Sequence, residues 1–296
     1  MSLNKRVCKM KKIPVRQITE ELKSPAPSER FKIRTLEAIL AGNVLKQDLH
    51  RHDFFFILLL EKGKGSHEID FAEYEVLDYS VFFLRPGQVH QLQLEANCTG
   101  YLMEFNDAFY HPTDKASSQR LRKASNKNYC ELEVHRFKKL QAILLQIFEE
   151  YTGREDGYLD MIKASLEIFF IEFVRQSPNP NSISQNISSY NQERFEEFLA
   201  CLDKHITTHK QVSDYTNKMS LSPYQLNEIT KGAVGKTPSE LINEQIILEA
   251  KRYLLATPNQ VKDIADHLGY EDVSYFIRFF KKHTNLSPEA FRHKQA

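Results

Sequence analysis

Hydrophobic and polar positions alternate over the first part of the 296-residue chain. Between about residues 31 and 105, short runs of β-branched and aromatic residues are separated by turn signals. In GSHEIDF and VHQLQLEA, apolar residues and histidines occupy every second position. A period of two is typical of strands with one buried face. Many short strands at this spacing predict a closed or nearly closed β-barrel.

Two segments with helical periodicity follow. In the first, between Val134 and Tyr151, the apolar stripe consists of Leu140, Ile143, Leu144 and Ile147. In the second, between Tyr158 and Arg175, the wider stripe consists of Ile162, Leu166, Phe169, Phe170 and Phe173. Such stripes are typical of helices that pack against a core. The wider one is equally compatible with a dimer seam, and both interpretations stay open.

A polar segment, SPNPNSISQNISS at 177–189, ends this half of the chain. It is rich in serine, asparagine and proline and carries no charge, which indicates a flexible linker. Short helices with explicit signals follow. Thr237-Pro-Ser-Glu240 supplies an N-cap, a proline at the first helical position and a capping-box glutamate, and Ser287-Pro-Glu repeats this opening. Gly269 is placed to end a helix.

The C-terminal part contains an internal repeat, in which Tyr224–Ile242 aligns with Ser274–Arg292 at an offset of 50. Each copy predicts a helix, a tight turn and a second helix with a good N-cap, Ser222 or Asp272. At about 100° per residue, one side of the second helix in the second copy contains Phe276, Phe279, Phe280 and His283. The opposite side contains Ser274, Arg278 and Lys281. These patterns predict two helix-turn-helix units, each with a candidate recognition helix.

Composition narrows the class of protein but does not identify a partner. Hydrophobic residues make up 41% and charged residues 27% of the chain, values typical of a globular protein. From Tyr190 onward, Lys plus Arg and Asp plus Glu both number 14, so charge does not indicate a polyanionic partner. Four dispersed cysteines without a CxxC pair predict reduced thiols in a cytoplasm. The longest apolar run, FFFILLL, is too short to cross a bilayer, and no signal peptide is expected.

The run VKDIADHLGYEDVSYFIRFFKKHTNLSPEAFR, residues 261–292, resembles the second helix-turn-helix signature of the AraC family of bacterial transcription regulators. It contains the IA…LG-aromatic turn, the SYF, R and FKK elements, and the SP and FR that follow. Asn285 stands where glycine is usual, and asparagine is the next-best residue for a left-handed position. The first unit matches more loosely, with Thr216 where alanine is usual. The N-terminal half resembles the family's cupin-like regulatory barrel through HRH at 50–52 and PGQVH at 86–90.

The resemblance implies a multidomain fold, with an N-terminal all-β cupin-like barrel carrying appended α-helices and a C-terminal all-α tandem helix-turn-helix domain. The expected boundaries are 1–30 for an N-terminal arm, 31–110 for the barrel, 111–176 for a helical, candidate dimerisation region, 177–189 for the linker, and 190–296 for the DNA-binding domain. Its helix-turn-helix units are expected at about 212–232 and 261–283.

The resemblance also implies a function. The expected protein is a sequence-specific DNA-binding transcription regulator, an activator and not an enzyme, without a cofactor. Its expected partners are an operator duplex, a second copy of the chain, RNA polymerase and a small-molecule effector, but no membrane. Base contacts are expected from Tyr224, Asn227, Glu228, Val273, Ser274 and Arg278. Phosphate contacts are expected from Lys231, Lys281 and Lys282. The alternative for Arg278 is an intramolecular pair with Glu271 or Asp272.

Histidines raise a rival interpretation. The candidate effector pocket contains His50, His52, His67 and His90. Three of these could instead form the site of a cupin metalloenzyme with a DNA-binding tail. The usual fourth ligand, a carboxylate or amide shortly after HxH, is replaced by Phe56 or Ile57, so no metal is expected. A scaffold that does not bind DNA is a further alternative. A DNA-repair methyltransferase is disfavoured because no cysteine lies in a PCHR-type setting.

The N-terminal arm is basic. It contains Lys5, Arg6, Lys9, Lys11, Lys12, Arg16 and Lys23 against Glu20 and Glu21. It is expected to be a solvated tail, with docking on the DNA-binding domain or on the barrel mouth as the alternative.

Overall fold

The computed structural model describes residues 10–18, 30–112, 114–176 and 189–295. The chain forms two compact units, one from Pro14 to Asn179 and the other from Pro180 to Ala296 together with Met1–Ile13. We call them the N-terminal and the C-terminal domain. Among the described helices, none is both long and apolar enough to span a membrane.

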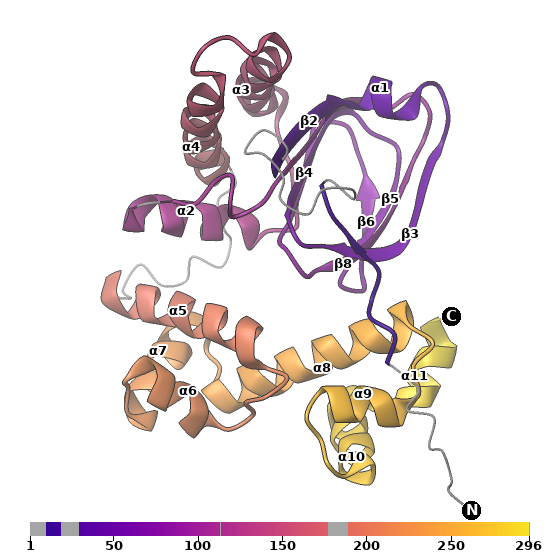
Figure 1. Ribbon diagram of the computed structural model, residues 1–296, viewed down its shortest axis with the longest axis vertical. Coiled ribbons are helices and arrows are strands. Elements are labelled where there is room, and N and C mark those ends of the chain that lie inside the picture. Colours follow the sequence, from indigo (N-terminus) through magenta and orange to yellow (C-terminus); the bar gives the residue numbers. More distant parts are fainter. Residues whose placement is uncertain (1–9, 19–29, 113, 177–188, 296) are drawn as a thin grey trace, which may run out of the picture. The chain divides into compact units, whose positions relative to one another are not determined.

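Two five-stranded sheets build the N-terminal domain (Figure 1). In order across it, sheet A contains β1 (Val15–Arg16), β3 (Leu45–His52), β8 (Val89–Leu94), β5 (Gly65–Ile69) and β6 (Ala72–Val76). Sheet B contains β10 (Tyr129–Glu131), β7 (Ser80–Leu84), β4 (Phe55–Lys62), β9 (Thr99–Phe105) and β2 (Phe31–Thr35). Only the short β1–β3 pair is parallel among the described strands. The β-rich, cupin-like domain is confirmed, as a double-sheet arrangement.

The facing sides of the two sheets enclose an apolar core. Leu58 of β4 and Phe82 of β7 meet Leu92 of β8 there, and helix α1 (Leu36–Leu40) adds its buried leucines. The predicted alternation holds along β5, where His67 is buried and Ser66 is exposed. Phe71 was expected to continue the inward set, but β5 ends at Ile69. Phe71 lies in the following turn with φ 70° and is only partly buried.

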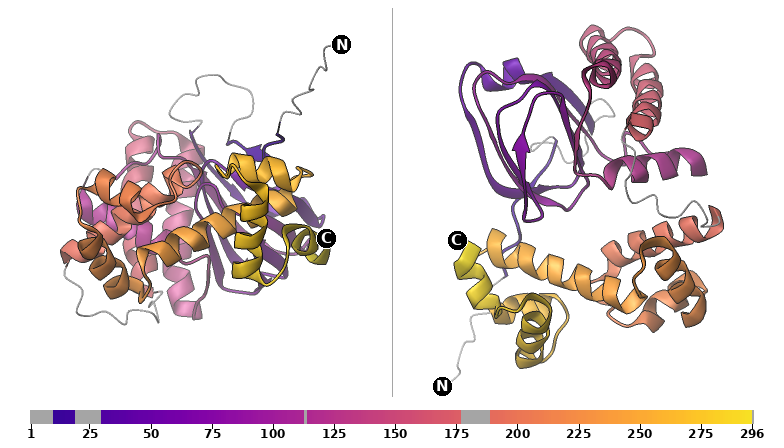
Figure 2. Two further views of the ribbon diagram at one scale, coloured as in Figure 1. Left: turned by 90° about the horizontal axis from the view of Figure 1, so that it is seen from below. Right: turned by 180° about the vertical axis from the view of Figure 1, so that it is seen from behind.

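Three helices cover the other face of sheet B (Figures 1 and 2). They are α2 (Lys115–Ser125), α3 (Val134–Gly153) and α4 (Tyr158–Gln176). Because both faces of the central strand β4 are buried from Phe55 to Leu60, this part of its sequence is continuously apolar instead of alternating. The stripe on α4 that began with Ile162 and ended with Phe173 packs into this second core. It is therefore internal and does not form a dimer seam.

Helices alone build the larger segment of the C-terminal domain. They are α5 (Ser189–His205), α6 (Val212–Met219), α7 (Pro223–Val234), α8 (Pro238–Ala256), α9 (Val261–His267), α10 (Val273–Thr284) and α11 (Pro288–Gln295). The long helix α8 joins a group formed by α5, α6 and α7 to a group formed by α9, α10 and α11 (Figure 1). The capping box predicted at its start forms, since Glu240 N–H donates to Thr237 Oγ1 and Thr237 N–H donates to Glu240 Oε2.

The described part of the N-terminal arm is not a free tail. Lys11 N–H donates to Asn259 Oδ1 at 2.9 Å, and Asn259 Nδ2 donates to Lys11 O at 2.6 Å. Arg292 holds the same loop by donating to Asn259 O. Beyond Pro14, Arg16 pairs with His52 through β1 and β3. The solvated-tail interpretation is therefore wrong for residues 10–16. The remaining charged residues of the predicted arm lie outside the described residues: Lys5, Arg6, Lys9, Glu20, Glu21 and Lys23.

Candidate nucleic-acid interface and histidine cluster

Helix α10 is positioned by its buried aromatic face. Phe276 and Phe280 are 0% exposed, and Asp272 caps the helix by accepting from Ser274 N–H at 2.8 Å. Asn285 ends it in the left-handed conformation, φ 60°, as predicted for this position. His283 was expected on the inward face but is exposed, with its ring 4.7 Å from that of Phe279. It lies in the last turn of the helix, beyond the core that Phe276 and Phe280 fill.

The opposite face of α10 is open. Ser274, Lys281 and Lys282 are exposed, and Val273 is half-buried at the first helical position. Arg278 retains 69% side-chain exposure. Its Nη2 lies 3.9 Å from Asp272 Oδ2, the intramolecular pair considered as an alternative. A long, exposed ion pair contributes about 0–1 kcal/mol, which leaves the guanidinium free to bind another partner.

Helix α7 has the same organisation. Ser222 and Gln225 form a capping box at its start, and Leu226, Ile229 and Thr230 are buried. Of the predicted DNA-contacting residues, Tyr224 is 73% exposed, Glu228 and Lys231 are exposed, and Asn227 is half-buried. Thr216, on the preceding helix α6, is buried, and its hydroxyl donates to Ser213 O at 3.0 Å. This hydrogen bond satisfies the threonine at a position where the family usually has alanine.

Lys210 connects the two helix-turn-helix units and was not identified from the sequence. Its Nζ donates to Gly269 O at 2.8 Å and lies 4.9 Å from the centre of the Tyr270 ring. Burial lowers the pKa of Lys210. Gly269 is left-handed, φ 71°, at the turn that precedes α10. No pattern in the sequence pairs residues this far apart, so only the fold reveals the contact.

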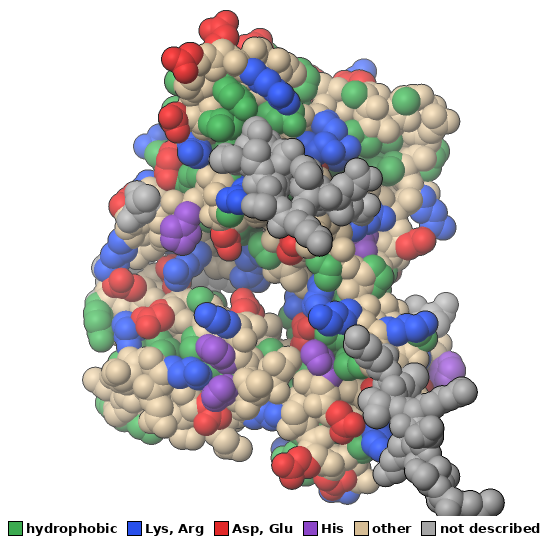
Figure 3. Space-filling model, viewed as in Figure 1, with side chains coloured by type: hydrophobic (Ala, Val, Ile, Leu, Met, Phe, Trp, Pro, Cys, Tyr) green, Lys and Arg blue, Asp and Glu red, His purple; other side chains and the backbone are tan. Residues whose placement is uncertain are grey.

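Charge does not single out the interface on the face shown in Figure 3. There, lysine and arginine side chains are interspersed with acidic ones. This mixture agrees with the formal net charge of +1. On this face no region of one charge marks the interface, and the candidate interface is defined instead by the exposed residues of α7 and α10.

Histidines from three neighbouring strands of sheet A meet in the N-terminal domain. His50 of β3 lies opposite His90 of β8 in the antiparallel register, and His52 and His67 adjoin them. His90 Nε2 is 2.7 Å from His52 Nε2, and His90 Nδ1 is 2.9 Å from His67 Nε2. His50 Nδ1 is 2.6 Å from Asp48 O and therefore carries the proton. The structure thus brings together all four predicted pocket histidines.

These imidazoles are buried and neutral. Burial is the main cause that lowers the pKa of all four, to about 3 for His52 and for His67. Three ring nitrogens find no hydrogen-bond partner within the described residues: His50 Nε2, His52 Nδ1 and His67 Nδ1. One ring nitrogen from each of His50, His52 and His90 lies within 4.8 Å of the others. The ring of Phe56 stacks on His52, 5.4 Å away, and supplies no ligand.

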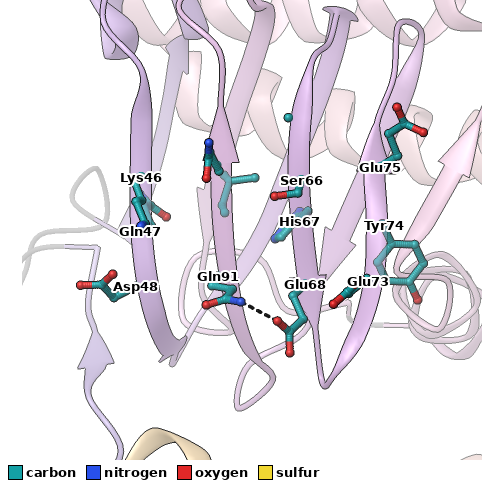
Figure 4. Close-up of a pocket in the computed structure, with 13 residues that line it drawn as sticks. Lys46, Gln47, Asp48, Ser66, His67, Glu68, Glu73, Tyr74, Glu75 and Gln91 are labelled. Atoms are coloured by element: carbon teal, nitrogen blue, oxygen red, sulfur yellow. Dashed lines mark hydrogen bonds between the residues drawn. The ribbon is translucent and has the colours of Figure 1, made fainter. Parts of the chain in front are cut away.

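A shallow groove of about 670 Å³ lies on the outer side of sheet A (Figure 4). Its residues include the exposed Lys46, Glu73 and Glu75, and Gln91 donates to Glu68 Oε2 across it. Exposed residues alternate here with the buried residues of the core, so the groove and the core occupy opposite faces of the sheet. The groove is open and polar, whereas the histidine cluster is buried.

Comparisons with known proteins agree with both halves of the fold. The family described as "AraC-like ligand binding domain" matches residues 32–165, and the family described as "Helix-turn-helix domain" matches residues 215–294. The HTH-type transcriptional activator RhaS of Escherichia coli O157:H7 is 26% identical over 247 residues, covering 82% of this chain and 86% of that protein. RhaS of Klebsiella pneumoniae is 27% identical over 253 residues with the same coverage.

Solved structures include a similar chain of comparable length. ToxT from Vibrio cholerae is 16% identical, with coverage of 89% of this chain and 98% of that chain and a TM-score of 0.42. The two family matches fall on the sheet domain with its helices and on the tandem helix-turn-helix domain, in the order that the motifs predicted. This chain belongs to the AraC family of DNA-binding transcription regulators.

Proposed function

We propose that α7 and α10 read the operator from two successive major grooves and that the second unit supplies most of the sequence specificity. The observation that carries this proposal is the open face of α10, where Arg278 is 69% exposed beside Ser274 and Lys281. A recognition helix contacts base edges from its exposed side, and the separation of two such helices on one duplex face is about 34 Å. Val273, beside Ser274 at the N-terminal end of α10, contributes an apolar contact to a base.

The first unit has a different chemical character. Tyr224, Asn227 and Glu228 contribute a phenol, an amide and a carboxylate. A carboxylate reads bases only by accepting a hydrogen bond, and cytosine N4 is the donor that carboxylates most commonly contact in the major groove, with adenine N6 as the other donor there. Lys231, Lys281 and Lys282 bind phosphates and fix the position of the protein without specifying sequence.

Arg278→Ala is expected to weaken binding to the preferred duplex by about 1–3 kcal/mol, roughly 5- to 150-fold. A bidentate contact to guanine would be lost, whereas binding to unrelated DNA would change little. The measurement is fluorescence anisotropy with a duplex selected from a randomised pool and with a scrambled control. Lys281→Ala is the matched variant, and it should weaken both duplexes alike and reduce the salt slope by about 1. Unchanged affinity of Arg278→Ala for the selected duplex would remove Arg278 from the interface.

A second copy of the chain is the proposed partner in assembly. Met161 and Ile168 on α4 are 43% and 54% exposed, and Leu145 on α3 is 43% exposed. Met161 and Ile168 are about two helical turns apart, so they lie on one side of α4. This side differs from the stripe that packs on sheet B and leaves apolar surface for an isologous contact.

Ile168→Glu is therefore expected to shift the protein from dimer to monomer, because a carboxylate would be buried without a partner in the proposed contact between the two α4 helices. Sedimentation velocity at several concentrations measures the shift. Val134→Glu, at a side chain 51% exposed at the start of α3, is the control and should leave the dimer intact. A wild-type protein that sediments as a monomer with and without operator DNA contradicts the dimer.

The proposed output is activation of transcription through RNA polymerase in the cytoplasm, without catalysis by this chain. The relatives RhaS of Escherichia coli and of Klebsiella pneumoniae are named as transcriptional activators, which supports this direction of regulation. The histidine cluster is the proposed effector site because it lies inside the stretch that matches the ligand-binding family and contains buried ring nitrogens that have no hydrogen-bond partner among the described residues. A buried polar group without a partner is unusual in a folded protein and requires an explanation.

A further inference from the structure

We propose that His50, His52 and His90 bind one divalent first-row transition-metal ion, with Zn²⁺ as the probe, and that this ion is the effector of the regulator. The metal site itself stands on the geometry of the histidines. Its role as effector rests on the proposed function. The sequence led to the opposite expectation, no metal, because Phe56 and Ile57 replace a fourth protein ligand.

His50 is the ligand that the structure prepares most clearly. Its Nδ1 donates to the carbonyl oxygen of Asp48 at 2.6 Å, which fixes the tautomer and leaves a lone pair on Nε2. Nε2 is buried and has no partner among the described residues. A neutral imidazole held by a hydrogen bond from its other nitrogen is the form in which histidine binds a metal.

His90 is oriented in the same manner by its other nitrogen. Its Nδ1 lies 2.9 Å from His67 Nε2, so a proton on Nδ1 leaves Nε2 as the donor to an ion. His67 then acts as a positioning residue behind the ligand. The fully buried ring of His67 keeps this arrangement out of contact with solvent.

His52 completes the set at the cost of a small movement. Its Nε2 is 2.7 Å from His90 Nε2, so one of the two carries a proton. Zinc–nitrogen distances of about 2.0–2.1 Å in a tetrahedral site place two ligand nitrogens about 3.3 Å apart. Because His90 carries its proton on Nδ1, the proton between the two Nε2 atoms belongs to His52. Binding therefore requires that this proton move to Nδ1 of the same neutral His52 ring, and that the two Nε2 atoms lie about 0.6 Å farther apart. Rotation of the two side chains can supply this separation, and one ring nitrogen from each of the three histidines already lies within 4.8 Å of the others.

The donor atoms define the class of ion. Three neutral imidazoles without a carboxylate suit Zn²⁺, Cu²⁺, Ni²⁺, Co²⁺ or Fe²⁺, whereas Mg²⁺, Ca²⁺ and Mn²⁺ prefer oxygen ligands. Phe56 stacks on His52, and Phe54 lies 4.3 Å from the same ring, centre to centre. These aromatic rings leave the fourth position to water or to a small anion, an arrangement known for sites with three protein ligands.

The first experiment measures the metal directly. Full-length protein is stripped with a chelator and titrated with Zn²⁺ against a chromophoric competitor, and Co²⁺ is added separately to record its visible absorption. We expect one ion per chain and a tetrahedral Co²⁺ spectrum. His50→Gln and His90→Gln should each weaken Zn²⁺ binding at least 100-fold, and His67→Gln about 10- to 100-fold. The control is His135→Gln, because the His135 side chain is 66% exposed on α3, and it should bind as wild type does.

Two results would overturn the site. One is absence of stoichiometric Zn²⁺ binding, and the other is undiminished binding in the folded His50→Gln and His90→Gln variants. Circular dichroism establishes folding, and if a variant is unfolded, the Co²⁺ spectrum of the wild type decides. A spectrum without the tetrahedral bands then rejects the site.

The second experiment tests the role of the ion. Affinity for the selected operator is measured with stripped and with Zn²⁺-loaded protein. A change of about tenfold or more, absent in His50→Gln, supports the effector role. Equal affinities with Zn²⁺ bound overturn that role and leave a structural metal. Failure of both forms to bind any duplex contradicts the proposed function instead, so the two failures are distinguishable.

Discussion

Replacing Phe170 by alanine is expected to lower the free energy of unfolding of the N-terminal domain by about 3–5 kcal/mol. Phe170 is 0% exposed, and its side chain extends from α4 into the core between this helix and sheet B. Its ring centre is 5.9 Å from that of Phe83, 6.1 Å from that of Phe105 and 5.5 Å from that of Tyr110. Truncation would leave a cavity bordered by three aromatic rings, from β7, from β9 and from the segment between β9 and α2, and these rings cannot close the cavity without moving the helix from the sheet.

Urea unfolding followed by far-UV circular dichroism measures this loss, with the transition of each domain assigned separately because a two-domain chain need not unfold in one step. Val134→Ala removes apolar atoms from a side chain 51% exposed on α3 and should change stability by less than about 0.5 kcal/mol. A loss below about 1 kcal/mol for Phe170→Ala would mean that the interface between α4 and the sheet is looser than described.

Gly269→Ala should be the most disruptive single-methyl change in the C-terminal domain. Gly269 has φ 71°, and a non-glycine residue in the left-handed region costs about 1–2 kcal/mol. In addition, a Cβ at this position would lie 2.6 Å from the carbonyl oxygen of Thr207 and 2.6 Å from Lys210 Nζ. The lysine side chain can move away, but the carbonyl belongs to the backbone. The substitution is therefore expected to displace the turn that precedes α10 and to weaken operator binding as well as stability.

Gly235 provides a matched control. Its φ of 73° is nearly the same, and a Cβ there meets nothing within 4 Å. Gly235→Ala should therefore cost only the conformational term, about 1–2 kcal/mol, and Gly269→Ala clearly more. Thermal and urea unfolding of both variants, with operator affinity at a temperature where both are folded, gives the comparison. Equal losses would mean that the contact with Thr207 relaxes freely. Adding Lys210→Ala should not restore Gly269→Ala, because the carbonyl clash persists.

Local patterns predicted the elements of the C-terminal domain because each helix carries its own signals. The cap at Thr237, the left-handed Asn285 and the buried Phe276 and Phe280 all follow from spacing along one helix. His283 was misplaced because helical phase gives only a direction from the axis. Whether a neighbouring helix packs over a side chain that points in that direction depends on the tertiary fold, and over His283 in the last turn none does among the described residues.

The N-terminal domain was less accessible to sequence reasoning because its order is non-local. FFFILLL reads as a strand, but its place between β7 and β9 depends on pairings with residues 80–84 and 99–105. Three of the histidines could be named from HxH and PGxxH. Their meeting depends on the register that sets His50 opposite His90, and the bond between His67 and His90 needs a third strand. The contacts of Lys210 and Lys11 with distant loops have no local signature.

The burial of β4 on both faces has a consequence for synthesis of the chain. The continuous apolar segment of β4 leaves the ribosome early. Its two neighbours in sheet B, β7 and β9, follow it in the sequence, and the helices that cover it follow later still. Phe137, the first buried residue of α3, is made roughly 75 residues after the end of the strand, a delay on the order of 4–15 s at about 5–20 residues per second. During this time the uncharged segment Phe55–Leu60 of β4, which has high β-propensity, is exposed to other nascent chains. Fragments that stop near residue 110 therefore lack the helical layer and should aggregate, so expression of this domain requires the chain through α4.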